Sequence, residues 1–224
     1  MKPATAEDAN PLWLRLWHGT QALLFFGLIA TGLSMHYAGS AWAVIPFSLS
    51  VQVHNACGIA TAVLWIVFVF YNAASGHMRH YIPKDLHIIH SAVIQLRYYV
   101  LGMFRGDAPP VTPGLRNNPA QQLSYAVVMY VLMPLAVGSG VLLLFPILAP
   151  ERALGRAGLW PMALLHLSVG YLLTLFLVVH IYLATTGETF FSLTREMITG
   201  SRASSPTSSP TSTTSSRTSE SEHA

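Results

Sequence analysis

The stretch His166–His180, "HLSVGYLLTLFLVVH", decides the fold, because a histidine stands at each end of a run without Asp, Glu, Lys or Arg. The run lies inside a longer apolar segment, and it therefore predicts a helix that crosses a membrane. At about 100° and about 1.5 Å per residue, the two histidines fall within about 40° of one face and about 21 Å apart along the axis. One helix can thus present two imidazoles to the interior of a bundle, one near each membrane surface.

The composition of the whole chain is that of an integral membrane protein. Its 224 residues are 52% hydrophobic and only 9% charged, and the mean hydropathy is +0.47. Segments of about 20 apolar residues are long enough to cross a bilayer as helices, and none shows the short alternating pattern of a barrel. The sequence predicts an all-α membrane protein, a four-helix transmembrane bundle with spans at about 12–37, 51–73, 122–148 and 160–186.

Histidine is the residue on which any cofactor must depend. The single cysteine, Cys57, excludes a disulfide framework, a CxxC redox pair, a thiolate zinc site and a cysteine-bound iron–sulfur cluster. The chain has 10 histidines against 12 Lys and Arg, a high share for so apolar a sequence. The basic residues stand singly between apolar segments, so the pI near 9.2 does not indicate nucleic-acid binding.

The basic residues predict the orientation of the chain, because cytoplasmic loops carry an excess of Lys and Arg. Most of them flank the spans on one side: Lys2, Arg15, Arg79, Lys84, Arg97, Arg105, Arg116, Arg195, Arg202 and Arg217. The opposite side has only Arg152 and Arg156. We therefore expect a multi-pass protein of a bacterial inner membrane, with both termini in the cytoplasm.

Two further segments have a distinct character. Between the second and third spans, "DLHIIHSAVIQLRYYVLGMF" carries apolar residues at helical spacing: Leu86, Ile89, Val93, Leu96 and Val100. This predicts a cytoplasmic amphipathic helix on the membrane surface. We expect residues 1–200 to form the membrane domain, and the Ser/Thr/Pro-rich tail 201–224 to be disordered.

The alternating topology predicts two pairs of histidines inside the bundle. His18 begins the first span and His180 ends the fourth, both on the cytoplasmic side, whereas His54 and His166 begin the two spans that enter from outside. A lone histidine in a span is often a satisfied hydrogen-bonding group. Four histidines at two matched depths instead favour two stacked bis-histidine sites.

Haem is the cofactor that suits such sites best. Zinc usually takes more ligands, with Cys or carboxylate among them, whereas haem needs only two axial imidazoles. The absence of a CxxCH motif indicates haem b, so we expect two haem b groups. Gly58 and Gly170 each follow an outer histidine by four residues, and together with Gly138 and Gly140 they could give a porphyrin clearance or allow close helix packing.

The remaining histidines have other expected roles. His36 lies at the outer end of the first span and suits a place at the membrane interface. Four lie in the cytoplasmic connection, where they would be surface or quinone-pocket residues: His77, His80, His87 and His90. His223 belongs to the tail.

Three stretches resemble a known family: "LRLWHGTQALLFFGLIATGLSMH", "VHNACGIA" and "HLSVGYLLTLFLVVH". They are similar to the four-helix dihaem cytochrome b subunits of membrane-bound formate dehydrogenases, NiFe hydrogenases and thiosulfate-reductase-type complexes, the bacterial cytochrome b561 group. The resemblance covers roughly residues 10–195, and the histidine spacing is its specific part.

The resemblance implies a function for the chain. Such a subunit anchors an iron–sulfur subunit and a catalytic subunit, which holds molybdenum, tungsten or NiFe, and passes electrons between them and the quinone pool. His18 and His180 would bind the cytoplasmic haem, and His54 and His166 the outer one. The stretch "NNPAQQLSY" implies a quinone site at Asn118, Ala120 and Gln121. The motif "RHYIP" at 79–83 is also shared, without a role that its chemistry assigns.

Two alternatives remain open at this point. One is a stand-alone haem b membrane oxidoreductase that takes electrons from superoxide and gives them to quinone. The other is a non-redox metal transporter lined by histidines, although transporters usually place polar groups near the midplane, where these spans are apolar. Whether the chain is itself an enzyme is therefore left open by the sequence.

Overall fold

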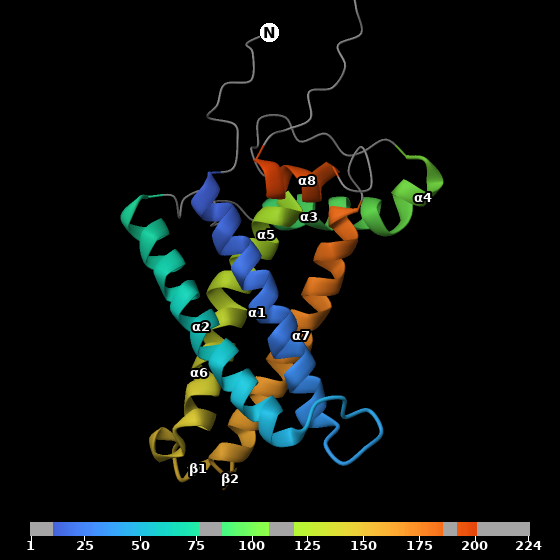
Figure 1. Cartoon of the computed structure of the whole chain (residues 1–224). Coiled ribbons are helices and arrows are strands. Elements are labelled where there is room, and N and C mark those ends of the chain that lie inside the picture. Colours follow the sequence, from blue (N-terminus) through green and yellow to red (C-terminus); the bar gives the residue numbers. More distant parts are fainter. Residues whose placement is uncertain (1–10, 77–86, 108–118, 186–191, 201–224) are drawn as a thin grey trace, which may run out of the picture.

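The computed structural model describes residues 11–76, 87–107, 119–185 and 192–200. Within these residues, four helices are long and apolar enough to cross a membrane: α1 Leu12–His36, α2 Phe47–Ala74, the stretch Gln122–Leu144, and α7 Leu159–Ala184. Figure 1 shows them as an elongated bundle. The predicted four-helix transmembrane bundle is confirmed, and the chain is a multi-pass membrane protein.

Proline and glycine set the helix ends. α1 begins directly after Pro11 and α2 directly after Pro46, since a proline at the start of a helix lacks only an N–H that would have no partner there. The second span therefore begins four residues earlier than predicted. Gly76, with φ +71°, follows the end of α2, a conformation that glycine adopts without strain.

The third span is built from three pieces rather than one continuous helix. α5 Pro119–Val127 leads into a π-helical turn, η4 Val128–Leu132, and then into α6 Met133–Leu144. Pro134 explains the change, because its ring clashes with the carbonyl four residues back and it has no N–H to donate. The span ends at Leu144 rather than at the predicted residue 148, because Phe145 leaves the helix and η5 Pro146–Leu148 follows as a short 3₁₀ turn.

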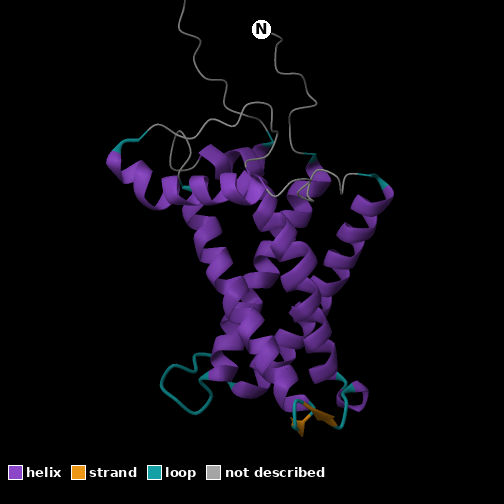
Figure 2. Cartoon of the chain, turned by 180° about the vertical axis from the view of Figure 1, so that it is seen from behind, coloured by secondary structure: helices purple, strands orange, loops and turns teal. Residues whose placement is uncertain are grey.

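A short hairpin joins the third span to the fourth. β1 Arg152–Ala153 pairs antiparallel with β2 Arg156–Ala157, with Arg152 opposite Ala157. Leu154 and Gly155 between the strands both have positive φ, 52° and 74°, as a two-residue hairpin turn requires. Figure 2 shows the strands at one extremity of the bundle, which we call the hairpin end.

The other extremity, the α3 end, carries the helices that do not span. α3 His87–Arg97 continues through a π turn, η3 Tyr98–Gly102, into α4 Met103–Arg105, and α8 Ser192–Thr199 lies nearby. α1 begins and α7 finishes at this end (Figure 1). The sequence did not predict α8, which is tied to α1 by the Arg15 Nε–H donating to the Met197 carbonyl at 3.3 Å.

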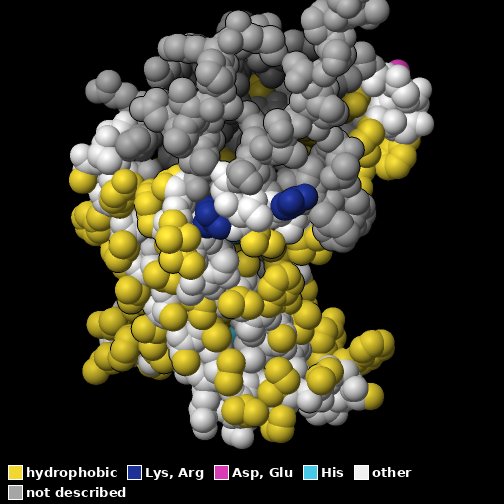
Figure 3. Space-filling view, turned by 45° about the horizontal axis from the view of Figure 1, so that its top comes forward, with side chains coloured by type: hydrophobic (Ala, Val, Ile, Leu, Met, Phe, Trp, Pro, Cys, Tyr) yellow, Lys and Arg dark blue, Asp and Glu magenta, His cyan; other side chains and the backbone are white. Residues whose placement is uncertain are grey.

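α3 is the amphipathic helix that the sequence predicted between the second and third spans. Ala92 and Gln95 are buried where α3 packs on α5. The predicted apolar face is exposed at Ile89, Val93, Leu96 and Val100, and Leu86 lies outside the described residues. The flank of the molecule is likewise mainly apolar (Figure 3), as expected of a surface that faces lipid rather than water.

The core is small and lies between the spans. Four buried side chains form it: Val128, Met133, Val169 and Leu173. Close packing joins α1 to α2 and α6 to α7, with α2 also contacting α6. Gly27 permits the first of these approaches, since a Cβ there would lie 3.2 Å from Cys57 Sγ. Among the described residues, α7 packs mainly on α6, and its backbone approaches α1 and α2 at isolated points only.

Candidate functional site

The four predicted histidines meet as two facing pairs. At the α3 end, His18 of α1 and His180 of α7 have ring centroids 6.1 Å apart and an interplanar angle of 54°. At the hairpin end, His54 of α2 and His166 of α7 have ring centroids 6.2 Å apart and an angle of 75°. The structure thus brings together the pairs that the topology predicted.

The spacing within each pair fits one metal ion held between two imidazoles. A metal–imidazole bond of about 2 Å on either side of one iron leaves the ring centroids about 6 Å apart. α7 supplies one histidine of each pair, and α1 and α2 supply the other two. That the pairs bind haem iron stays a prediction, and the residues present fit that group.

The donor set favours haem over a bare metal ion. In the part of the chain that the structure describes, no group of three or more His, Cys, Asp or Glu side chains could hold a metal ion. Two imidazoles alone make a poor zinc site, which usually has four ligands. A porphyrin supplies the remaining four nitrogens itself, so two imidazoles per site are sufficient.

The glycines that follow His54 and His166 by four residues have little protein beside them. A Cβ on Gly170 would have no protein atom of another turn or helix within 4 Å, and one on Gly58 would meet only Leu28 Cδ2 at 3.9 Å. That this space gives a flat ring clearance stays a prediction. Gly138 is similarly open, whereas a Cβ on Gly140 would lie 3.1 Å from His166 Cε1, so Gly140 makes room for the histidine itself.

Two hydroxyl groups that the sequence analysis did not single out contact the histidines at the hairpin end. Thr31 Oγ1 lies 3.0 Å from His54 Nδ1, and Ser139 Oγ lies 3.0 Å from His166 Nδ1. His166 Nδ1 also lies 3.1 Å from the Ala136 carbonyl. Each hydroxyl residue is followed directly by a glycine that borders the same ring, Gly32 or Gly140, and this Thr/Ser–Gly pair is the signal that could have revealed them.

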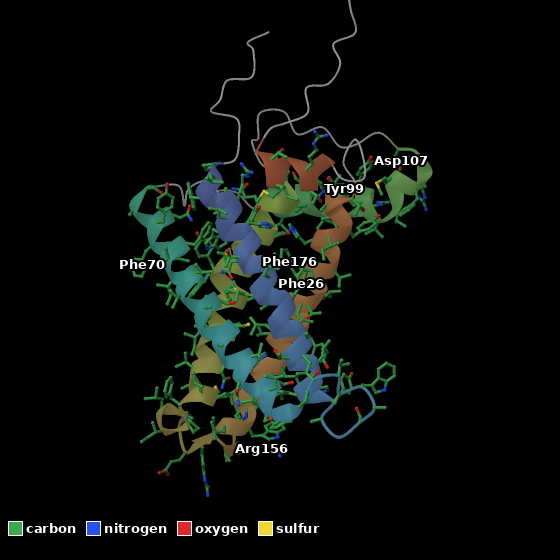
Figure 4. All side chains as sticks on the ribbon, viewed as in Figure 1. Phe26, Phe70, Tyr99, Asp107, Arg156 and Phe176 are labelled. Atoms are coloured by element: carbon green, nitrogen blue, oxygen red, sulfur yellow. The ribbon has the colours of Figure 1, made fainter. Side chains whose placement is uncertain are left out.

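The pair at the α3 end has different surroundings. His180 is stacked on Phe176, one turn earlier in α7, with centroids 5.6 Å apart and planes 24° apart. Two residues beyond His180, the Tyr182 hydroxyl donates to the Tyr99 carbonyl at 3.5 Å, which ties α7 to η3. Tyr99 is labelled near the end of α7 in Figure 4. His36, predicted at the interface, packs edge-on against Tyr37 and Tyr171 at the hairpin end.

The residues implied for quinone are only partly described. Asn118 lies outside the described residues. Ala120 is the second residue of α5, and its N–H donates to Oε1 of the buried Gln95 at 3.3 Å, so α3 holds the first turn of α5. Gln121 follows in α5. His77, His80, His223, the tail 201–224 and the motif at 79–83 also lie outside the described residues, and His90 lies in α3.

Comparison with known proteins identifies the family of the chain. A family model described as "Prokaryotic cytochrome b561" matches residues 9–200. The chain is 34% identical over 207 residues to a protein of Escherichia coli K12 named "Putative cytochrome YdhU", and the match covers 89% of this chain and 78% of that protein. This chain therefore belongs to the prokaryotic cytochrome b561 family, membrane proteins that transfer electrons through haem b.

Proposed function

We propose that the chain carries two haem b groups and is the membrane subunit of a larger oxidoreductase. In this proposal it passes electrons between the quinone pool and a partner iron–sulfur subunit, which connects to a catalytic subunit with molybdenum, tungsten or NiFe. The observation that carries the proposal is the meeting of four histidines as two pairs, with ring centroids 6.1 Å apart in one pair and 6.2 Å apart in the other. The family resemblance supports the choice of partners.

The spacing along α7 supports an electron path through the membrane. His166 and His180 are separated by 14 residues of one continuous helix, about 21 Å along its axis. A haem b at each position would supply reversible one-electron chemistry. Between His166 and His180 the helix carries no Asp, Glu, Lys or Arg, so no charged side chain of α7 stands along that path.

In this proposal the residues of the chain bind the haem groups, orient them and leave space for them. The four histidines would each offer one ring nitrogen to iron, and Gly58 and Gly170 leave space beside the outer pair. In the described part of the spans, the residues between the pairs are mainly apolar and no carboxylate stands among them. This arrangement suits electron transfer and provides no chain of acidic groups for carrying a proton or metal ion through the middle.

We propose the quinone site at the α3 end, around Asn118, Ala120 and Gln121, near the His18–His180 pair. The contact between Gln95 and the Ala120 N–H supports it, because this contact fixes the start of α5 against the crossing helix α3. The sequence carries its excess of Lys and Arg before the first span, between the second and third spans and after the fourth, which supports a bacterial inner membrane with both termini in the cytoplasm. Quinone exchange would then occur beside the cytoplasmic haem.

Purification of the tagged chain from membranes under mild detergent tests the proposal. We expect a b-type reduced-minus-oxidised spectrum, two haems per chain, and co-purification of an iron–sulfur protein. Recovery of the chain alone, with haem and with superoxide-driven quinone reduction, would instead support the stand-alone oxidoreductase. A protein without any b-type absorbance would contradict both and leave the metal transporter.

A further inference from the structure

The histidines at the hairpin end are held by hydroxyl groups on helices other than their own. Thr31 of α1 contacts His54 of α2, and Ser139 of α6 contacts His166 of α7, each at 3.0 Å from Nδ1. Both hydroxyls are deeply buried, with Thr31 2% exposed and Ser139 3% exposed. These are therefore interior contacts that water and lipid do not replace.

The hydrogen bonds fix which ring nitrogen carries the proton. The Thr31 hydroxyl donates to the Gly27 carbonyl at 2.6 Å, and the Ser139 hydroxyl donates to the Leu135 carbonyl at 2.6 Å. Each hydroxyl has then used its only hydrogen, so toward the imidazole it can only accept. Nδ1 of His54 and of His166 must carry the proton, which leaves Nε2 with a free lone pair for a metal.

A carbonyl group beside Ser139 leads to the same assignment for His166. His166 Nδ1 lies 3.1 Å from the Ala136 carbonyl. Because a carbonyl accepts and never donates, Nδ1 of His166 must be the donor. On α1 the Leu28 carbonyl stands in the equivalent place, 3.3 Å from Thr31 Oγ1, as the Ala136 carbonyl lies 3.2 Å from Ser139 Oγ.

Glycine makes this approach possible on both helices. A Cβ on Gly32 would lie 3.4 Å from His54 Cε1, and one on Gly140 would lie 3.1 Å from His166 Cε1. The glycine after each hydroxyl residue thus gives the ring room to reach the hydroxyl. Thr31–Gly32 and Ser139–Gly140 are equivalent cradles, built twice in one chain.

The pair at the α3 end has no such cradle. Among the described residues, no hydroxyl or carbonyl group forms a hydrogen bond with a ring nitrogen of His18 or His180. His180 is stacked on Phe176 instead. The two pairs therefore share their spacing and differ in the polar groups behind the rings. This difference bears on the iron, because an acceptor on the distal N–H makes an imidazole a stronger electron donor.

We propose that Thr31 and Ser139 are positioning residues that hold His54 and His166 in the Nδ1–H tautomer and lower the reduction potential of the haem between them. The proposal rests on the proposed function in that it takes both pairs to bind haem. Stronger donation from both axial ligands stabilises the ferric state more than the ferrous state. The two haems thereby become unequal, with the hairpin-end haem the harder to reduce.

Redox titration of Thr31→Val, Ser139→Ala and the double variant tests this inference, with the His180→Ala chain used to assign the hairpin-end haem. We expect two haems per chain, an upward shift in the midpoint potential of the hairpin-end haem alone, and a larger shift in the double variant. Electron paramagnetic resonance of the ferric state should change for the same haem. Thr31→Ser, which restores the hydroxyl, should recover the original potential and spectrum.

Thr174→Val is the matched control. The Thr174 hydroxyl also donates to the carbonyl four residues back, that of Gly170 at 2.8 Å, but no ring nitrogen of the described residues contacts it. The haem midpoint potentials of the Thr174→Val variant should match those of the parent chain. Selective loss of the hairpin-end haem, reversed by Thr31→Ser, would also support the inference. Two haems with unchanged potentials and spectra would overturn it, whereas a parent chain without two haems would overturn the proposed function instead.

Discussion

The indole N–H of Trp65 in α2 donates a hydrogen bond of 2.9 Å to the backbone carbonyl of Met129 in the third span. Met129 belongs to the π turn η4, in which the Met133 N–H is taken by the Val128 carbonyl. The next residue, Pro134, has no N–H to offer. The Met129 carbonyl therefore loses its partner within the helix, and Trp65 supplies one from the neighbouring span.

Replacing Trp65 by Phe should destabilise the bundle, because it leaves that carbonyl unpaired in an apolar environment. We expect a cost of about 1 kcal/mol, measured as earlier loss of the haem absorbance during thermal or detergent unfolding. In a Pro134→Ala background the third span regains a donor, so the same Trp65→Phe change should cost less. Equal costs in the two backgrounds would show that Pro134 and Trp65 act independently.

Removal of one histidine should affect one pair only. His180→Ala takes a ligand from the α3-end pair and leaves His54 and His166 in place, so the haem content should fall from two per chain to one. His54→Ala should give the same content but remove the other haem, with a different remaining potential. Pyridine haemochrome quantification and redox titration measure both. Loss of both haems in either variant would mean that the sites are not independent.

Filling the space beside Gly170 should block haem binding at the hairpin end. Gly170→Phe introduces a ring at a position where a Cβ itself would meet no protein atom within 4 Å. We expect the hairpin-end haem to be lost and the other haem to remain. Leu175→Phe is the control, because Leu175 is nine residues after His166, about 180° around the helix, and is 60% exposed. Retention of two haems in Gly170→Phe would show that the space serves another purpose.

Gln95 should matter for quinone exchange and not for haem. Its side-chain oxygen accepts from the Ala120 N–H at the start of α5, and Gln95→Leu removes that acceptor at similar volume. We expect slower quinone turnover with an unchanged haem spectrum, and a similar effect for Asn118→Ala. Val93→Leu, on the exposed face of α3, is the control. Unchanged quinone kinetics in both Gln95→Leu and Asn118→Ala would place the quinone site elsewhere.

The four spans and the meeting of the histidines could be predicted from the sequence because both depend on local information. An apolar run of sufficient length specifies a span, and alternating direction then decides which histidines share a depth. His18 with His180 and His54 with His166 follow from position alone. The limits of the spans were less predictable, because they depend on Pro46 and on the turn around Pro146.

The hydroxyl groups behind His54 and His166 could not be predicted in the same way. A Thr or Ser inside a membrane helix usually bonds to the carbonyl four residues back, and Thr31 and Ser139 do so as well as contacting a ring. The second contact depends on the rotation of α1 and α6 relative to their neighbours, which is a property of tertiary packing. Pro134 explains the π turn once the structure is known, and the short helix α8 lacks the apolar run from which a span can be predicted.

The place of α7 has a consequence for how the protein is made. Both histidine pairs take one member from α7, and at the hairpin end the ring contacts come from four different spans. During synthesis from the N-terminus, neither pair exists until this last span has entered the membrane beside the first three. If the two pairs bind haem as proposed, loading must follow insertion of all four spans, and a chain truncated before residue 159 should enter the membrane without acquiring haem.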